Sequence, residues 1–246
     1  MNGKIALFVL GMHRSGTSLM AGCLAALGVD FGTDMVPARK DVNEKGFFEH
    51  RQVLEVHDQL LALLGSDWAD PCALPEDWWH GASGMAEQRH LRSIAHQDLC
   101  GPVIGVKDPR LARLLPLWTD VMREEARAAK AVIVLRKPSE IAASLKRRDQ
   151  FSEERSLLLW LTQMLSTEEV TRDLPRLFIT FEEILENSTA ACQKIADHLD
   201  VPFPTSPEDS REALAAFATP SLRHHQIASP ENPMVAEAWE VFQRAA

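Results

Sequence analysis

The sequence predicts an α/β fold of three layers, with a central parallel sheet flanked by helices. Two observations predict it. Short apolar, β-branched runs alternate along the chain with longer segments whose apolar residues recur at helical spacing. The strand-like runs are apolar throughout, which is typical of parallel strands that are covered on both faces. No repeat, low-complexity tract or linker divides the 246 residues, so we expect a single domain over residues 1–246.

The expected strands share a short apolar run and are Ile5–Leu10, Val103–Val106, Ala131–Leu135 and Leu177–Thr180. The expected helices are Thr17–Leu27, Arg51–Leu64, Met85–Leu99, Leu111–Ala129, Pro138–Arg147, Glu153–Thr171 and Thr189–Leu199, then a short helix after Pro207 and a C-terminal helix. Gly28 is expected to end the first helix, and Pro138 suits a first helical turn. The segment Ser66–Gly84 is predicted to be a long loop.

Composition and charge exclude several classes of protein. Hydrophobic residues make up 46% of the chain and charged residues 25%, which excludes a disordered chain. A net charge of -9 argues against binding to nucleic acid or to an anionic membrane surface, so any bound anion must be held in a local pocket. No apolar stretch of roughly 18 residues is present, and we expect a cytoplasmic protein. No metal site is expected: the cysteines lack metal-ligand spacing, and His50 and His57 without a third ligand are predicted to be surface histidines.

A glycine-rich segment, Gly11-Met12-His13-Arg14-Ser15-Gly16-Thr17-Ser18, follows the first strand and opens the first helix. It has the GxxxxG-x-[ST] spacing of a phosphate-binding P-loop, with Thr17 where an ATPase or GTPase has lysine. Its glycines let backbone N–H groups turn inward, and the helix N-terminus adds partial positive charge. The hydroxyls of Thr17 and Ser18 can donate hydrogen bonds to phosphate, and Arg14 supplies a cation. The sequence therefore predicts a P-loop-type fold.

Two of the strand ends that should face the phosphates carry cations. A Mg²⁺-dependent nucleotide site needs a carboxylate at such a strand end. Here Ala131–Leu135 is followed by Arg136, and Val103–Val106 is followed by Lys107. The sequence therefore predicts a nucleotide site that works without a metal ion.

Two motifs resemble one enzyme family. The segment Gly11–Leu19 looks like the 5′-phosphosulfate loop of sulfotransferases that use 3′-phosphoadenosine 5′-phosphosulfate (PAPS). Val132–Pro138 is similar to that family's 3′-phosphate motif, in which a strand-ending arginine, here Arg136, is followed eight positions later by a helical serine, here Ser144. The resemblance implies PAPS as the co-substrate, held without a metal ion by His13, Arg14, Ser15, Gly16, Thr17, Ser18, Arg136 and Ser144. Arg223, in the basic segment Thr219–Gln226, either closes over the phosphates of PAPS or belongs to a solvated turn.

The catalytic residues follow from further resemblances. Val106–Arg110 resembles a lysine-containing strand end of tyrosylprotein sulfotransferases and several bacterial members, so Lys107 is expected, with Arg14, to stabilise charge on the departing phosphate. Gly46-Phe47-Phe48-Glu49 resembles an element of bacterial members that act on sugars and other metabolites. Glu49 is therefore the expected general base, its pKa raised by the two phenylalanines, and the alternatives are Glu44, His50 and Asp108.

The expected reaction is sulfuryl transfer from PAPS to a hydroxyl or amine of a small molecule, sugar or natural product. Trp68, Trp78 and Trp79 either line the acceptor pocket or anchor their loop to the core. Nucleic acid and membranes are not expected partners, and a homodimer stays open as the assembly state. Two alternative functions also stay open: a P-loop kinase acting on a metabolite, and a non-catalytic nucleotide-binding module.

Overall fold

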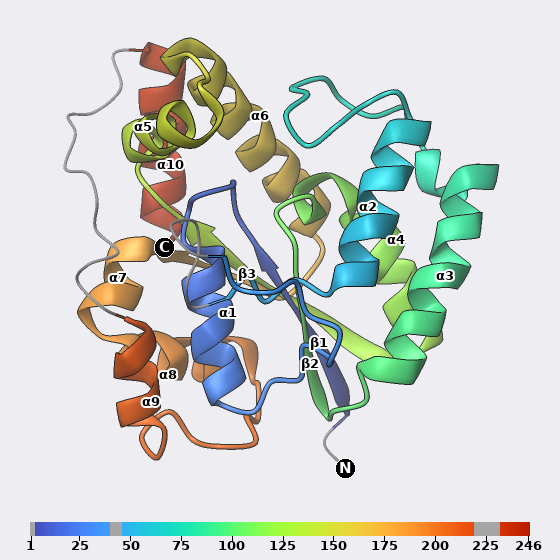
Figure 1. Cartoon of the computed structure of the whole chain (residues 1–246). Coiled ribbons are helices and arrows are strands. Elements are labelled where there is room, and N and C mark those ends of the chain that lie inside the picture. Colours follow the sequence, from blue (N-terminus) through green and yellow to red (C-terminus); the bar gives the residue numbers. More distant parts are fainter. Residues whose placement is uncertain (1–2, 40–45, 219–231) are drawn as a thin grey trace.

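The computed structural model describes residues 3–39, 46–218 and 232–246. Its strands form one parallel sheet in the order β2-β1-β3-β4 (Figure 1). The strands are β1 (Lys4–Leu10), β2 (Val103–Lys107), β3 (Arg127–Leu135) and β4 (Arg176–Thr180). Because all strands run in one direction, the segments that follow β1, β2 and β3 meet at one edge of the sheet, where ligands bind in open α/β folds.

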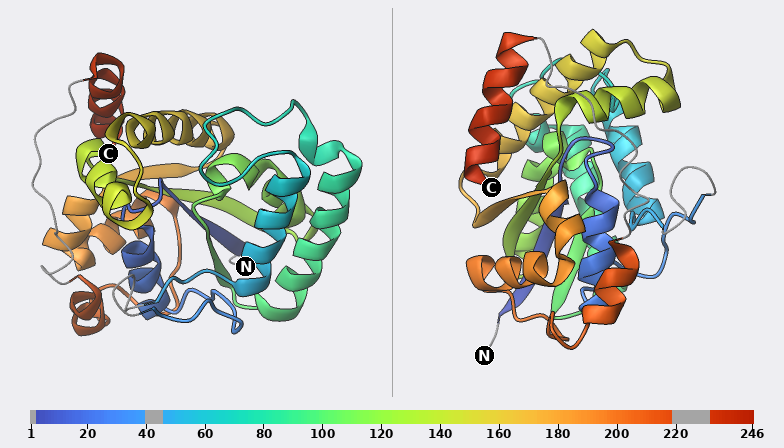
Figure 2. Two further views of the ribbon diagram at one scale, coloured as in Figure 1. Left: turned by 45° about the horizontal axis from the view of Figure 1, so that its top comes forward. Right: turned by 90° about the vertical axis from the view of Figure 1, so that its left-hand side faces the viewer.

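Helices cover both faces of the sheet, which confirms the predicted three layers. Alternate side chains of β1 enter two separate cores, Ala6, Phe8 and Leu10 on one side and Ile5, Leu7 and Val9 on the other. The first core is covered by α2 (Arg51–Leu63), α3 (Ala82–Asp98), α4 (Leu111–Glu124), α5 (Pro138–Asp149), α6 (Glu153–Thr171) and α10 (Pro233–Ala245). The second is covered by α1 (Thr17–Ala26), α7 (Phe181–Glu186), α8 (Ser188–Leu199) and α9 (Arg211–Phe217). Figure 2 shows α10, in red, next to α6, where Trp239 and Phe242 contact Trp160.

One predicted helix is too long. The helix expected over Leu111–Ala129 ends at Glu124, and β3 begins at Arg127, so the expected strand Ala131–Leu135 gains four residues at its start. Ala126 has a left-handed backbone, with φ of 53°, and this reverses the chain. The segment from Arg127 to Lys130 pairs with β1 from Lys4 to Leu7, so sheet pairing overrides a local composition that favours helix.

Two short helical segments were not expected. Helix α7 follows β4 directly and begins with a capping box, in which Thr180 and Glu183 satisfy each other's backbone N–H groups. A 3₁₀ turn, η1 (Trp78–His80), lies inside the loop predicted for Ser66–Gly84, and α3 begins three residues before the predicted Met85. The other helices and strands start and end within two residues of prediction. None of the described helices combines the length and the apolar character needed to cross a bilayer.

Candidate active site

The glycine-rich segment forms the loop between β1 and α1. Gly11, Arg14 and Gly16 all have positive φ, at 145°, 71° and 102°. A Cβ on Gly16 would lie 2.4 Å from the Phe181 ring, so only glycine fits there. The Ser15 hydroxyl is buried, and no hydrogen-bond partner for it occurs in the described part of the chain. A buried, unpartnered donor in this loop is consistent with a site built for an anionic ligand.

The two motifs predicted to bind PAPS, the glycine-rich loop and the 3′-phosphate motif, meet in the structure. Arg14 Nε donates to Ser144 Oγ at 2.9 Å, and Arg136 Nη1 donates to the Arg14 carbonyl at 3.1 Å. Arg136 is fixed further by Glu140, at 2.9 Å, and by the Phe181 ring, 4.2 Å from its guanidinium carbon. The predicted residues are therefore brought together, although the direct contact joins Ser144 to Arg14 and not to Arg136.

Positive charge is concentrated around Arg14. Burial, together with the nearby cations Arg148, Arg136 and Arg147, lowers the pKa of Arg14 to about 10. Clustered guanidinium groups repel each other, and a bound phosphate or sulfate would relieve that repulsion. These side chains fit the phosphate groups of PAPS.

Lys107 and Glu49 form a buried ion pair beside the loop. Lys107 Nζ lies 2.6 Å from Glu49 Oε1 and 3.1 Å from Ser18 Oγ, and the two charged residues are only 4% and 8% exposed. Burial raises the pKa of the Glu49 carboxyl, while Lys107 acts in the opposite direction. The expected direction of the shift is therefore confirmed. The role of Glu49 as a general base stays a prediction.

The backbone beside Glu49 is unusual. Phe48 has φ of 56°, which is rare for a bulky side chain and costs conformational energy. Its ring packs edge-on against Phe31 and Phe217, with centroids 6.0 and 5.9 Å away. These aromatic contacts hold the strained residue next to Glu49 in place.

The alternative bases differ in their surroundings. Asp108 is buried, which alone would raise its pKa, but Arg110 and His57 hold that pKa far below its usual range. His50 is buried at the start of α2, and its Nε2 lies 2.9 Å from Asp98 Oδ2. Glu44 lies outside the described residues. Glu49 is thus the described candidate whose pKa is raised and which also reaches Lys107.

The prediction that His50 and His57 are surface histidines is wrong. Both are buried, and His57 is fully inaccessible. Trp118 Nε1, which can only donate, lies 2.8 Å from His57 Nε2, so Nδ1 carries the proton and donates to Asp108 Oδ2 at 2.8 Å. The helical spacing of Val53 and His57 could have shown that they share the buried face. Within the described ranges, no group of three metal-ligating side chains is present.

His13 and Trp68 lie at the edge of the loop. Their rings are 4.4 Å apart, and Trp68 stacks on Phe151 at 5.7 Å. Burial, with Arg110 and Arg148, lowers the pKa of His13 well below 6.5, so its imidazole is neutral. Trp78 is buried in the core and anchors its segment. Arg223 lies outside the described residues.

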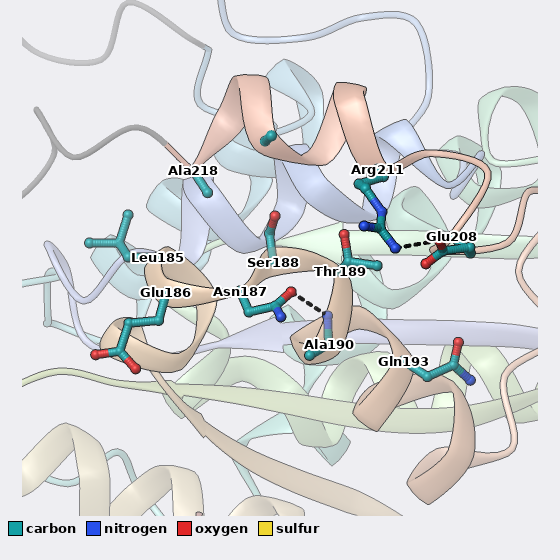
Figure 3. Close-up of a pocket in the computed structure, with 11 residues that line it drawn as sticks. Leu185, Glu186, Asn187, Ser188, Thr189, Ala190, Gln193, Glu208, Arg211 and Ala218 are labelled. Carbon is teal, nitrogen blue, oxygen red and sulfur yellow. Dashed lines mark hydrogen bonds and ion pairs between the residues drawn. The ribbon is translucent and has the colours of Figure 1, made fainter.

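A separate hollow of about 520 Å³ lies between the start of α8 and helix α9 (Figure 3). Asn187 caps α8 by accepting from the Ala190 N–H at 2.9 Å, and an ion pair joins Arg211 to Glu208 at the opposite side. None of the predicted site residues lines this hollow.

Comparison with known proteins decides the family. Residues 6–205, most of the chain, match the family described as "Sulfotransferase family". The chain belongs to the sulfotransferase family. This confirms the resemblance and the activity class, sulfuryl transfer, and membership implies PAPS as the donor.

Two solved structures have a similar fold. The sulfotransferase domain from the Synechococcus PCC 7002 olefin synthase has a TM-score of 0.53 and 16% identity, with 97% of this chain and 88% of that chain covered. The sulfotransferase domain from the curacin biosynthetic pathway has a TM-score of 0.52 and 15% identity, with 100% and 99% covered. At these identities the likeness shows the fold alone. The comparison with curated proteins gave no match.

Proposed function

We propose that this sulfotransferase moves the sulfuryl group of PAPS to a hydroxyl or amine of a small molecule, carbohydrate or natural product, with Glu49 as general base and no metal ion. The observation that carries the proposal is the position of Lys107 Nζ, 2.6 Å from Glu49 and 3.1 Å from Ser18 of the loop. One buried ammonium thus joins the base to the donor-binding segment.

The donor side is assigned by charge and geometry. The backbone N–H groups of the loop from His13 to Gly16, with the hydroxyls of Ser15, Thr17 and Ser18, would hold the 5′-phosphosulfate. Arg136 and Ser144 would hold the 3′-phosphate, and Arg14, which contacts both, would lie between the two anionic groups. Four clustered arginines supply the positive charge that a divalent ion supplies in many nucleotide sites, and this supports metal independence.

The transfer step needs one proton acceptor and one stabilised leaving group. As the acceptor oxygen or nitrogen forms its bond to sulfur, Glu49 takes the proton from that atom. The bond between sulfur and the bridging oxygen breaks, and its electron pair stays on the phosphate of 3′-phosphoadenosine 5′-phosphate (PAP). Lys107 is placed to stabilise that developing charge. The raised pKa of Glu49 makes it a stronger base than an exposed glutamate.

The acceptor is proposed to approach past Trp68. This indole covers the neutral imidazole of His13 at 4.4 Å, next to the loop. A half-buried indole beside an imidazole whose Nε2 has no hydrogen-bond partner in the described part of the chain suits the flat faces of sugars and aromatic compounds. Trp78 and Trp79, which pack against each other at 5.8 Å, are assigned to anchoring.

Ligand-induced thermal shifts test the donor site. A ligand at 100 times its Kd stabilises the folded state by about 2.7 kcal/mol, a shift of roughly 5 to 10 °C for a chain of this size. We expect that shift with PAP in the presence of EDTA and a smaller one with ADP. Equal shifts with PAP and ADP would remove the 3′-phosphate role of Arg136 and Ser144. Stabilisation by ATP that requires Mg²⁺ would contradict the metal-free site.

A screen of acceptors with labelled PAPS tests the base. With an acceptor in hand, Glu49→Gln should keep PAP affinity within about twofold and lower turnover by about a hundredfold or more. Glu55→Gln is the matched control, because it removes a carboxylate from α2 whose side chain is 52% exposed. Normal turnover in Glu49→Gln would assign the base to another residue.

A further inference from the structure

Three side-chain pairs connect the start and middle of α2 to the end of β2. We call them the α2–β2 ladder: Glu49 with Lys107 at 2.6 Å, His57 with Asp108 at 2.8 Å, and Asp58 with Arg110 at 2.6 and 3.1 Å. One partner of each pair lies on or just before α2, and the other lies in the short segment 107–110. The ladder therefore fixes the helix against the strand end.

The His57 pair is the most constrained of the three. His57 is fully buried, and Trp118 of α4 fixes its tautomer from the other side at 2.8 Å. Asp108 also accepts hydrogen bonds from the backbone N–H and the side chain of Arg110, at 2.9 and 3.0 Å. His57 is thus connected through Asp108 to the third pair, so the second and third pairs form one hydrogen-bonded network.

Glu49 lies next to the start of α2. It directly precedes His50, which occupies the N-cap position of α2, and residues 46–48 before it are not helical. His57 lies seven residues after His50, about 10 Å along the helix axis at 1.5 Å per residue. A helix moves as a rigid unit over that length. A small tilt at His57 would therefore lengthen the 2.6 Å contact between Glu49 and Lys107.

We propose that His57, assisted by Asp58, is a positioning residue that sets the geometry of the Glu49–Lys107 pair. The catalytic consequence of this inference rests on the proposed function of Glu49. His57 itself acts through Asp108 and α2, since its two ring nitrogens are both occupied by protein partners.

A double-mutant cycle tests the proposal without an acceptor. Glu49→Gln, Lys107→Met and the double variant give the coupling of the pair from urea unfolding. The charged groups facing Glu49 are Lys107, Asp108 and Arg110, so all measurements use one pH and one salt concentration. The cycle is repeated in His57→Asn, which keeps an N–H for Asp108, and in His57→Phe, which removes it.

We expect a coupling of about fivefold or more in the unfolding constant for the wild type and for His57→Asn, and less than about twofold for His57→Phe. An unchanged coupling in His57→Phe, together with lower stability, would assign His57 to ordinary core packing and overturn the proposal.

His57→Phe replaces a buried polar ring and can disturb folding. Two variants at exposed positions of α2 therefore give the same test. Asp58 and Glu55 lie on α2 with side chains 49% and 52% exposed, but Asp58 pairs with Arg110 of the ladder and Glu55 with Arg51 of its own helix. Asp58→Asn should weaken the Glu49–Lys107 coupling, and Glu55→Gln should leave it intact. Equal couplings in the two variants would contradict the ladder.

Turnover separates this inference from the proposed function. If Glu49 is the base, Asp58→Asn should lower kcat while the Kd for PAP stays within about twofold, because Asp58 pairs with Arg110 and not with a residue of the phosphate loop. If Glu49→Gln retains full turnover but the couplings behave as expected, the base assignment fails and the positioning of the pair stands. If the couplings fail while Glu49→Gln is inactive, the ladder fails alone.

Discussion

Removing the ammonium group of Lys107 should leave Glu49 as a buried carboxylate without its counter-charge. At a separation of 2.6 Å and an effective dielectric constant of about 20, the gross attraction within the pair is about 6 kcal/mol. Desolvation of both groups offsets part of that attraction, and loss of one partner from a buried pair costs about 3–5 kcal/mol. We therefore expect Lys107→Met to lose about 3 kcal/mol or more in its free energy of unfolding at neutral pH.

The loss should depend on pH. Burial already raises the pKa of Glu49, and removal of Lys107 takes away the opposing influence. A carboxyl whose pKa is higher in the folded protein favours folding below its unfolded pKa of about 4.3, and this contribution is lost as pH rises through the folded value. Lys107→Met should therefore be less stable at pH 8 than at pH 5. Protonation of Glu49 as the pH falls reduces the penalty.

Urea unfolding at pH 5 and pH 8 measures the effect. The double variant Glu49→Gln with Lys107→Met is the reference, because it has neither charge. At pH 8 the double variant should be the more stable of the two, and at pH 5 the difference should shrink. A deficit of equal size at both pH values would refute the reasoning, since it would place the cost in packing around the lysine chain and not in the charge of Glu49.

Three further predictions concern single residues. Arg14→Gln removes one cation from the arginine cluster and should weaken PAP binding about tenfold or more in calorimetry. The pKa of His13 is well below 6.5 in the folded protein. As the pH falls from 7.5 to 5, the unfolded chain takes up a proton on His13 and the folded protein does not, so the free energy of unfolding should fall. In urea unfolding, His13→Asn should lose less stability over the same pH range. Asn187→Ala removes the cap of α8 and should cost about 1 kcal/mol in urea unfolding with PAP affinity unchanged.

Local patterns were sufficient to predict most of the fold. β1 is apolar throughout because each of its faces enters a different core, and a segment of this kind is recognisable without a structure. The start of β3 was not recognisable, since Arg127-Ala128-Ala129-Lys130 is a good helical sequence and becomes strand only by pairing with β1. The strand order also depends on contacts between distant segments, and the periodicity of single segments does not report on those contacts.

Site residues that lie within one sequence motif were predictable. Contacts between site residues of two distant segments were not. The loop from Gly11 to Ser18 is a local signal. The pairing of Glu49 with Lys107 joins residues 58 positions apart, and the sequence suggested each residue separately but not their contact. His57 was missed for a related reason: its burial follows from its helix face, but its partners Asp108 and Trp118 come from other segments.

The charge of the whole chain and the charge of the site have opposite signs. The protein carries -9, yet the loop lies among Arg14, Arg136, Arg147 and Arg148. Two carboxylates, Glu140 and Asp149, pair with two of these arginines, which leaves an excess of two positive charges. Glu140 also fixes Arg136 against the carbonyl of Arg14. A bound phosphate needs both preset geometry and net positive charge, and the arginine cluster with its two carboxylates supplies both at the loop. The acidic remainder of the surface disfavours binding of extended polyanions.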